Sequence, residues 1–322
     1  MGKKQGILGE EKIVLAPMAG ITFFAYRRFM HEFGFNITYT EMISDMGLIY
    51  NNKETLDYLD FPKTDFKTGV QLFGHDPESL AKAALICQKA NKYIDFFDVN
   101  MACPVPKVTK QGSGGALLND PKKCGDIIRE IKKVTHLPVT AKIRLGFYTT
   151  NLNFIDVIDE LENAGVDMIA IHARSVKDLY GGSPRYELLK GLGLKLKVPL
   201  IVSGNIFTVE DAVRALEITK ADAVMIARGG VGNPFIGKEI KHYLKTKELL
   251  PSPSIKERKE ACLRLAEYLI EEKGEEKAMR IYRGIAPKFF SNLPNIKLLR
   301  QELSNHLSSY IDLVKLIDLI GD

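Results

Sequence analysis

The residues best suited to chemistry in this chain lie in the segment VNMACPVPKV, residues 99–108, which contains Cys103. Pro104 and Pro106 follow the cysteine and prevent a regular helix or strand from continuing through it. A thiol in solution is mostly protonated at neutral pH, so it can donate a proton as readily as it can act as a nucleophile. Nucleophilic catalysis would require a nearby base, and His172 is the one histidine expected at the end of a strand. Cys103 is therefore the candidate catalytic residue.

The other cysteines have a plainer interpretation. Cys87, Cys124 and Cys262 each fall on an apolar stripe with helical spacing, so we expect them to be buried. With four cysteines and no Cys-x-x-Cys pair, the chain predicts neither a disulfide framework nor a zinc site. No carboxylate or histidine cluster predicts any other metal site.

The elements that must position Cys103 follow a regular alternation. Eight short β-rich runs recur before residue 245, and segments with apolar residues at helical spacing separate them. Eight βα units in about 240 residues are typical of a (β/α)8 TIM barrel, although a doubly wound sheet shares the alternation. After residue 245 the β-rich runs cease, and LLPSPSIKER introduces a helical pattern. We therefore expect an α/β catalytic domain over residues 1–245 and a small helical domain over residues 246–322.

Active sites of such barrels lie at the carboxyl ends of the strands. The runs that end in SGNI and ARGG place small residues where the backbone can approach a phosphate, although tight turns would use the same residues. Lys142 lies within the fifth run, and a lysine there suggests an anionic partner such as a reduced flavin. Each of these residues has an alternative interpretation. Lys142 could extend to solvent, and His172 could be a core residue whose hydrogen bonds are made within the protein.

Charge indicates a polyanionic partner. The 322-residue chain carries a net charge of +5. Residues 277–300 hold six basic residues and no acidic one, interleaved with Tyr282, Phe289 and Phe290. This composition favours RNA contact over a merely solvated helix face. The candidates for RNA contact are Arg280, Arg283 and Lys288.

Taken together, these motifs resemble the tRNA-dihydrouridine synthase family. They are APMAGIT, EMIS, VQLFG, NMACPVPKV, GSGGALL, AKIRLG, IHARS, SGNI and ARGGVGNP, in that order along the chain. The segment from residue 280 to residue 303 is similar to the family's helical tRNA-binding module. The resemblance implies an FMN enzyme that uses NADPH or NADH to reduce the C5–C6 double bond of selected uridines in tRNA.

The resemblance also implies roles for individual residues. Cys103 would protonate C5 of uracil, and Asn100 and Arg174 would hold the base after it is unstacked. The residues expected to bind FMN are Pro17, Met18, Ala19, Gln71, Lys142, His172, Ser203, Gly204, Asn205, Ala227 and Arg228. Two positions depart from the family pattern: Ala102 replaces a usual Gly, and Phe23 stands where many members have Asp.

Two other functions are compatible with parts of the sequence. A small-molecule FMN oxidoreductase of the dihydroorotate dehydrogenase type would share the barrel but would not need the basic helices. A non-catalytic tRNA-binding protein would not need Cys103, Lys142 and the phosphate loops together. We find no apolar span or leader pattern, so we expect a cytoplasmic protein with no membrane association. No obligate protein partner is implied.

Overall fold

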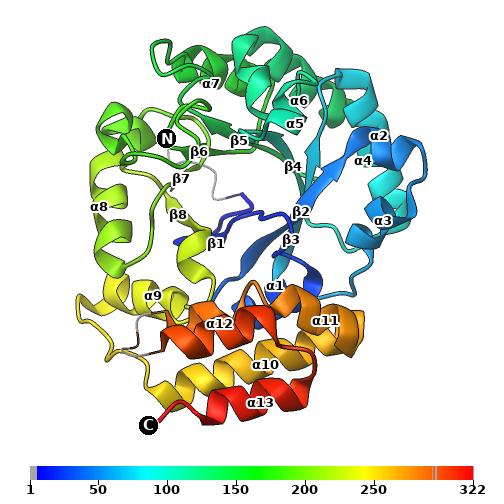
Figure 1. The fold of residues 1–322 in the computed structure, drawn as a ribbon. Coiled ribbons are helices and arrows are strands. Elements are labelled where there is room, and N and C mark those ends of the chain that lie inside the picture. The colour runs from blue at the N-terminus through cyan, green and yellow to red at the C-terminus, as the bar shows by residue number, and fades with distance from the viewer. Residues whose placement is uncertain (1–5, 292, 294–295, 322) are drawn as a thin grey trace.

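Eight parallel strands form a nearly closed barrel in the computed structural model, which describes residues 6–291, 293 and 296–321 (Figure 1). The sheet order is β1-β8-β7-β6-β5-β4-β3-β2, so β1 and β2 are its two edges, and these edges are in contact. The TIM-barrel expectation is confirmed. The strands are β1 Ile13–Leu15, β2 Ile37–Ser44, β3 Lys67–Phe73, β4 Phe96–Met101, β5 Val139–Arg144, β6 Met168–His172, β7 Leu200–Ser203 and β8 Ala223–Ile226.

Helices surround the barrel because each has one apolar face. In α4, for example, Leu80, Ala84 and Cys87 are all fully buried, as their spacing predicts. One unit departs from the expected alternation, since only short 3₁₀ turns connect β6 and β7. The helices along the barrel are α1 Phe24–His31, α2 Asp45–Ile49, α3 Lys53–Leu56, α4 Pro77–Ala90, α5 Pro106–Thr109, α6 Pro121–Val134, α7 Phe154–Asn163, α8 Val209–Thr219 and α9 Ile236–Thr246.

Described residues after 254 form helices and turns without strands. These helices are α10 Ile255–Lys273, α11 Glu275–Tyr282, α12 Lys297–Asn305 and α13 Tyr310–Asp318, and we call them, with the described turns between them, the helical segment. They pack together below the barrel in Figure 1, with α10 against α1. A single continuous hydrophobic core joins them to the barrel. The domain boundary at residue 245 therefore stays a prediction.

The contact between α10 and α1 includes an unusual helix cap. The N-cap residue of α1 is Phe23, whose side chain makes no capping hydrogen bond. Instead, the Ala25 N–H donates to Glu272 Oε2 of α10 at 2.5 Å. A carboxylate at a helix N-terminus satisfies an otherwise unpaired donor and interacts favourably with the helix dipole. Glu272 thus does for α1 what a capping side chain at position 23 would do.

The strand register brings the expected site residues to one level of the barrel. Asn100 pairs with Lys142, Arg144 pairs with His172, and His172 pairs with Ser203 across adjacent strands. These pairs lie at the carboxyl ends of β4 to β7. Within the described residues, no helix is long and apolar enough to cross a membrane.

Candidate functional site

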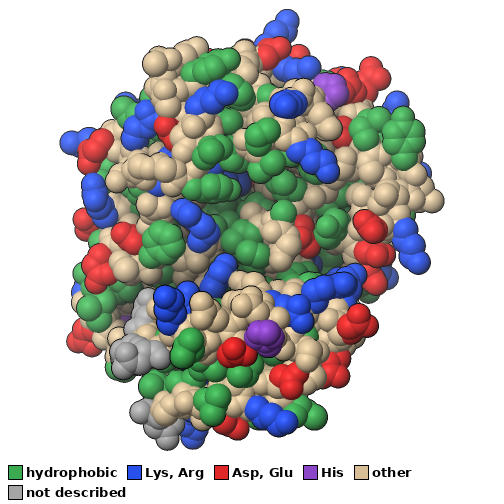
Figure 2. All heavy atoms as spheres, viewed as in Figure 1, with side chains coloured by type: hydrophobic (Ala, Val, Ile, Leu, Met, Phe, Trp, Pro, Cys, Tyr) green, Lys and Arg blue, Asp and Glu red, His purple; other side chains and the backbone are tan. Residues whose placement is uncertain are grey.

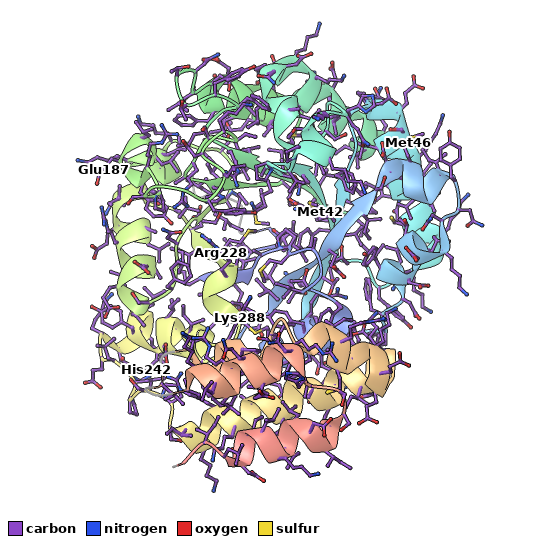
Figure 3. All side chains as sticks on the ribbon, viewed as in Figure 1. Met42, Met46, Glu187, Arg228, His242 and Lys288 are labelled. Atoms are coloured by element: carbon purple, nitrogen blue, oxygen red, sulfur yellow. The ribbon has the colours of Figure 1, made fainter. Side chains whose placement is uncertain are left out.

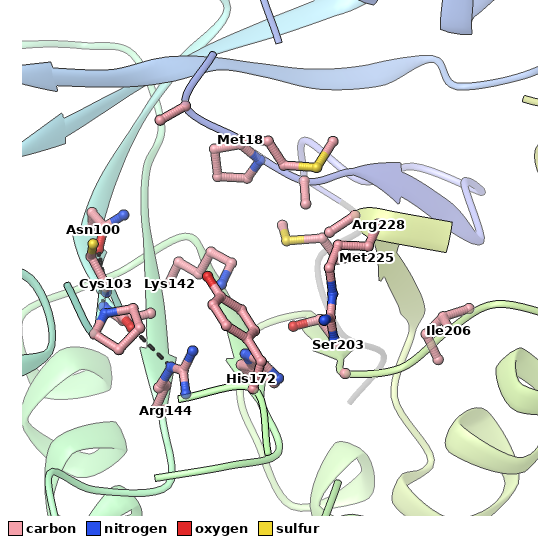
Figure 4. A pocket seen from close by; sticks show the side chains of 18 of the residues that line it. Met18, Asn100, Cys103, Lys142, Arg144, His172, Ser203, Ile206, Met225 and Arg228 are labelled. Atoms are coloured by element: carbon pink, nitrogen blue, oxygen red, sulfur yellow. Dashed lines mark hydrogen bonds between the residues drawn. The ribbon is translucent and has the colours of Figure 1, made fainter. Parts of the chain in front are cut away.

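A cavity of about 390 Å³ opens at the carboxyl ends of the strands, within the range typical of small-molecule sites (Figure 4). Figure 4 shows Asn100 and Cys103 on one side, Ser203 and Arg228 on the other. Most of the residues expected at the site are brought together here. Those that line it are Pro17, Met18, Ala19, Asn100, Cys103, Lys142, His172, Ser203, Gly204, Asn205, Ala227 and Arg228.

The Cys103 loop is held from both sides. The Cys103 N–H donates to Asn100 Oδ1 at 2.8 Å, and its carbonyl accepts the N–H of Gly115 at 3.0 Å. Gly114 has φ +59°, and a Cβ there would lie 2.8 Å from Val108 Cγ1 and 3.1 Å from the Cys103 Cβ, so this position favours glycine. The Cys103 side chain therefore stays at the wall of the cavity, where the residue is 8% exposed.

Lys142 contributes a half-buried cation. Burial, and secondarily the charge of Arg144, lowers the pKa of its ammonium group to about 8, although the carboxylate of Asp98 opposes the shift. Within the described part of the chain, no hydrogen bond or ion pair is made by this ammonium group. A lining cation without a partner suits an anionic ligand.

His172 is a neutral imidazole. Burial, followed by the surrounding charges of Arg144 and Lys142, holds its pKa well below the usual range. Arg174 Nη1 lies 3.1 Å from His172 Nε2. Because a guanidinium can only donate, Nε2 accepts and the ring proton sits on Nδ1.

Arg174 itself does not line the cavity. It is 1% exposed, and its guanidinium also donates to the carbonyls of Gly181 and Gly182. Arg174 therefore holds His172 and the loop over residues 181–182 through these hydrogen bonds. Its expected contact with uracil stays a prediction.

Gln71 is likewise below the cavity surface. It is fully buried, and its Oε1 accepts a hydrogen bond from Asn100 Nδ2 at 2.8 Å. Its Nε2 donates to Asp98 Oδ2 at 2.6 Å. The expected contact of Gln71 with a flavin also stays a prediction.

The loops after β7 and β8 lie close together. Gly204 and Asn205 have positive φ values of +132° and +48°, which direct the chain after β7 along the cavity. A Cβ at Gly229 would lie 1.9 Å from the carbonyl oxygen of Ile206, so only glycine permits this approach. Arg228 Nη2 donates to Asn205 Oδ1 at 3.1 Å and joins the two loops.

Sequence reasoning missed several residues of the cavity, among them two with polar side chains, Arg144 and Tyr180. Arg144 lines it beside Cys103, and its Nε donates to the carbonyl of Ala102 at 2.9 Å. The sequence does contain a signal for Arg144, because it follows Lys142 by two positions and side chains two apart share a face of a strand. Tyr180 lies in an irregular loop between the guanidinium groups of Arg144 and Arg228, 5.5 and 4.9 Å from its ring centre, and no local pattern marks it.

The basic residues of the helical segment have different surroundings. Arg280 and Lys288 are exposed, whereas Arg283 is half-buried and its Nε donates to the Leu307 carbonyl at 2.8 Å. Figure 3 shows Lys288 near the boundary with the barrel, below Arg228. Lys and Arg side chains lie on both sides of the hollow in Figure 2.

The expected aromatic contacts with RNA are wrong. Tyr282, Phe289 and Phe290 are all fully buried in the core, and Phe289 packs against Phe29 of α1 with ring centres 6.3 Å apart. Aromatic residues at such positions hold the helical segment together and have no face free for a base.

Comparisons with known proteins identify similar sequences over most of the chain. A family model described as "Dihydrouridine synthase (Dus)" matches residues 14–313. The chain is 33% identical to a probable tRNA-dihydrouridine synthase of Aquifex aeolicus, with 95% of both chains covered. It is 32% identical to tRNA-dihydrouridine synthase B of Pseudomonas aeruginosa, covering 91% of this chain and 88% of that protein.

Solved structures support the fold. Histamine dehydrogenase from Rhizobium sp. 4-9 matches 81% of this chain with a TM-score of 0.54 and 14% identity, and the match spans 48% of its length. An amine oxidase that acts on 6-hydroxypseudooxynicotine, from Pseudomonas geniculata N1, gives a TM-score of 0.54 at 13% identity over 72% of this chain and 47% of that one. The chain thus spans about half the length of these two structures.

Proposed function

From the premise that this chain belongs to the dihydrouridine synthase family, we propose that it uses FMN and NADPH or NADH to reduce uridines in tRNA, with Cys103 as the proton donor. Reduction of tRNA uridines by a flavin-dependent oxidoreductase follows from the family itself. The choice of FMN, the nicotinamide reductant and the residue roles are the proposal. A tRNA substrate is also consistent with the expected cytoplasmic location. Family membership does not support the small-molecule and non-catalytic alternatives.

The residues of the cavity fit a flavin mononucleotide. The observation that carries this is the Lys142 ammonium group, which lines the cavity and makes no hydrogen bond or ion pair with the described residues. Lys142 and the Nδ1–H of His172 would hold the ring system, which gains negative charge on reduction. Pro17, Met18 and Ala19 would contact the ring, and the phosphate would lie against Ser203–Asn205, Ala227 and Arg228. When bound, a reduced flavin supplies the hydride for the uracil double bond.

The chain's own residues would supply the remaining proton and the orientation. Reduction of a C5–C6 double bond adds one hydride and one proton, and the thiol of Cys103 would deliver the proton to C5. Asn100 holds the backbone of Cys103, so it orients the donor. Arg144 lines the cavity beside this loop and would hold the polar edge of the base, in addition to the expected contact from Asn100.

The test is to measure dihydrouridine in tRNA that lacks the modification, after incubation with purified protein and NADPH. Cys103→Ala should lower the rate by about 10²- to 10⁴-fold, the usual contribution of a positioned acid. It should retain the flavin absorbance, because the thiol is not expected to hold the cofactor. Cys124→Ala is the matched control, since Cys124 is a fully buried cysteine of α6 that does not line the cavity. An unchanged rate in Cys103→Ala would show that another group donates the proton.

A further inference from the structure

A buried carboxylate lies in the barrel interior, and the proposed chemistry does not use it. Asp98 is fully buried on β4, two residues before Asn100 and on the same face of the strand. Burial raises the pKa of its carboxyl group to about 6, although hydrogen bonds from Gln71 and Thr140 oppose the shift. Asp98 therefore remains mostly ionised at neutral pH. An ionised side chain in a barrel core costs stability unless it is paired.

Asp98 begins a chain of hydrogen bonds that ends at the catalytic loop. Thr140 Oγ1 and Gln71 Nε2 donate to its two oxygens at 2.5 and 2.6 Å. Asn100 Nδ2 donates to Gln71 Oε1 at 2.8 Å. Asn100 Oδ1 in turn accepts the N–H of Ala102 at 3.1 Å and that of Cys103 at 2.8 Å.

The direction of this chain follows from its first member. An ionised carboxylate can only accept, so Gln71 must turn its NH₂ toward Asp98 and its oxygen toward Asn100. Asn100 must then turn its NH₂ toward Gln71, which leaves its oxygen facing the backbone N–H of Cys103. The charge of Asp98 thereby orients Gln71, and it reinforces the orientation that the N–H groups of Ala102 and Cys103 give to Asn100.

We propose that Asp98 is a positioning residue for the reaction: through Gln71 and Asn100 it fixes the loop that carries the Cys103 thiol. This inference rests on the proposed role of Cys103 as proton donor. With an asparagine at position 98, either end of the new amide can face Gln71. Gln71 then no longer always presents its oxygen to Asn100 Nδ2, so Asn100 is held less firmly and the Cys103 loop opens more often.

The loop is monitored directly by alkylation of Cys103. Purified protein without tRNA or NADPH is treated with iodoacetamide, and labelling of Cys103 is followed by mass spectrometry. The other three cysteines are fully buried, so Cys103 should react first. Asp98→Asn and Gln71→Met should each label about fivefold faster, the factor expected for loss of one neutral hydrogen bond. Asp95→Asn is the control, because Asp95 accepts a backbone N–H from Thr68 near the opposite end of the barrel and should leave the rate unchanged.

Charge needs a separate control, because removing a carboxylate can raise the reactivity of a thiol at a distance. Gln71→Met changes no charge, so it distinguishes the two effects. The substitution is also repeated in an Asn100→Ala background, where the hydrogen-bond chain is already broken. If Asp98 acts through Asn100, Asp98→Asn should have no further effect on labelling there. Equal acceleration in both backgrounds, or none in Gln71→Met, would overturn the proposal.

Activity gives the second readout. For Asp98→Asn, kcat with tRNA should fall several-fold while the KM for tRNA stays the same, because the tRNA-binding surface is untouched. A rise in KM with unchanged kcat would overturn the positioning role. The outcome is separable from the proposed function: if Cys103→Ala retained full activity, Cys103 would not be the donor, yet the labelling result would still report on the loop.

Discussion

At the residue scale, the site consists of groups whose charge is set by burial. Lys142 loses solvation at the wall of the cavity, and this lowers its pKa to about 8. His172 is kept neutral by burial and by neighbouring cations. Each of these states costs the free protein stability and prepares the cavity for an anionic ligand.

Lys142→Met should therefore stabilise the flavin-free protein. The unfolded lysine binds its proton up to about pH 10.5 and the folded one only up to about pH 8, so the folded state gains stability as pH rises through this window. The variant should be more stable than the parent by up to about 3 kcal/mol near pH 7, and by less than about 1 kcal/mol near pH 10. Urea unfolding at both pH values measures this. Lys190→Met, at an exposed position, should show no such pH dependence. Equal gains at both pH values would contradict the burial argument.

Which site residues the sequence predicts depends on how local their signal is. Cys103, Lys142 and His172 each stand in or directly after a β-rich run, and the cavity contains all three. Gln71 and Arg174 stand in similar positions, yet they lie behind the lining because neighbouring residues use their hydrogen bonds. The hydrogen bonds that Gln71 and Arg174 make behind the lining depend on strand register, which one sequence does not specify.

At the element scale, the alternation of strands and helices predicts the barrel because each strand is a short apolar run. All eight predicted runs are strands. The segment between β6 and β7 contains Gly181, Gly182, Pro184, Gly191 and Gly193, which favour turns over a long helix. The cap of α1 was outside the reach of sequence reasoning, because Glu272 lies 247 residues from the N–H that it accepts.

Glu272→Gln should destabilise the protein by about 1 kcal/mol, because α1 loses the charged acceptor at its N-terminus. Thermal unfolding measures the effect. Glu271→Gln is the matched control: Glu271 pairs with Arg28 of α1, but its side chain is 67% exposed, so its loss should cost a few tenths of a kcal/mol. Equal stability of the two variants would show that the negative charge of Glu272 at the N-terminus of α1 contributes little.

At the scale of the whole molecule, basic side chains lie on both the barrel and the helical segment around the cavity (Figure 2). The sequence predicts the charge but not its placement, since the packing of the helical segment against the barrel, mainly of α10 against α1, brings the two surfaces together. The same packing buries the aromatic residues expected to contact RNA.

Lys288→Ala should weaken tRNA binding and reduce the slope of log Kd against log salt by about one ion, as expected for the loss of one phosphate contact. Filter binding at several salt concentrations measures this. Lys315→Ala is the control, because Lys315 is exposed on α13, at the outer side of the helical segment in Figure 1. The same slope in both variants would place the tRNA elsewhere on the surface.

Because Glu272 caps α1, the helical segment of this protein cannot be replaced independently of the barrel. A chimera that joined the barrel to the helices of another protein after residue 254 would lose the acceptor for the Ala25 N–H and the partner of Phe29 at once. The graft would have to carry α1 with it, because an acidic residue introduced at position 23 could cap the helix but would not replace the partner of Phe29. In a chimera, the helical segment and α1 must therefore be exchanged together, although more than 200 residues separate them in sequence.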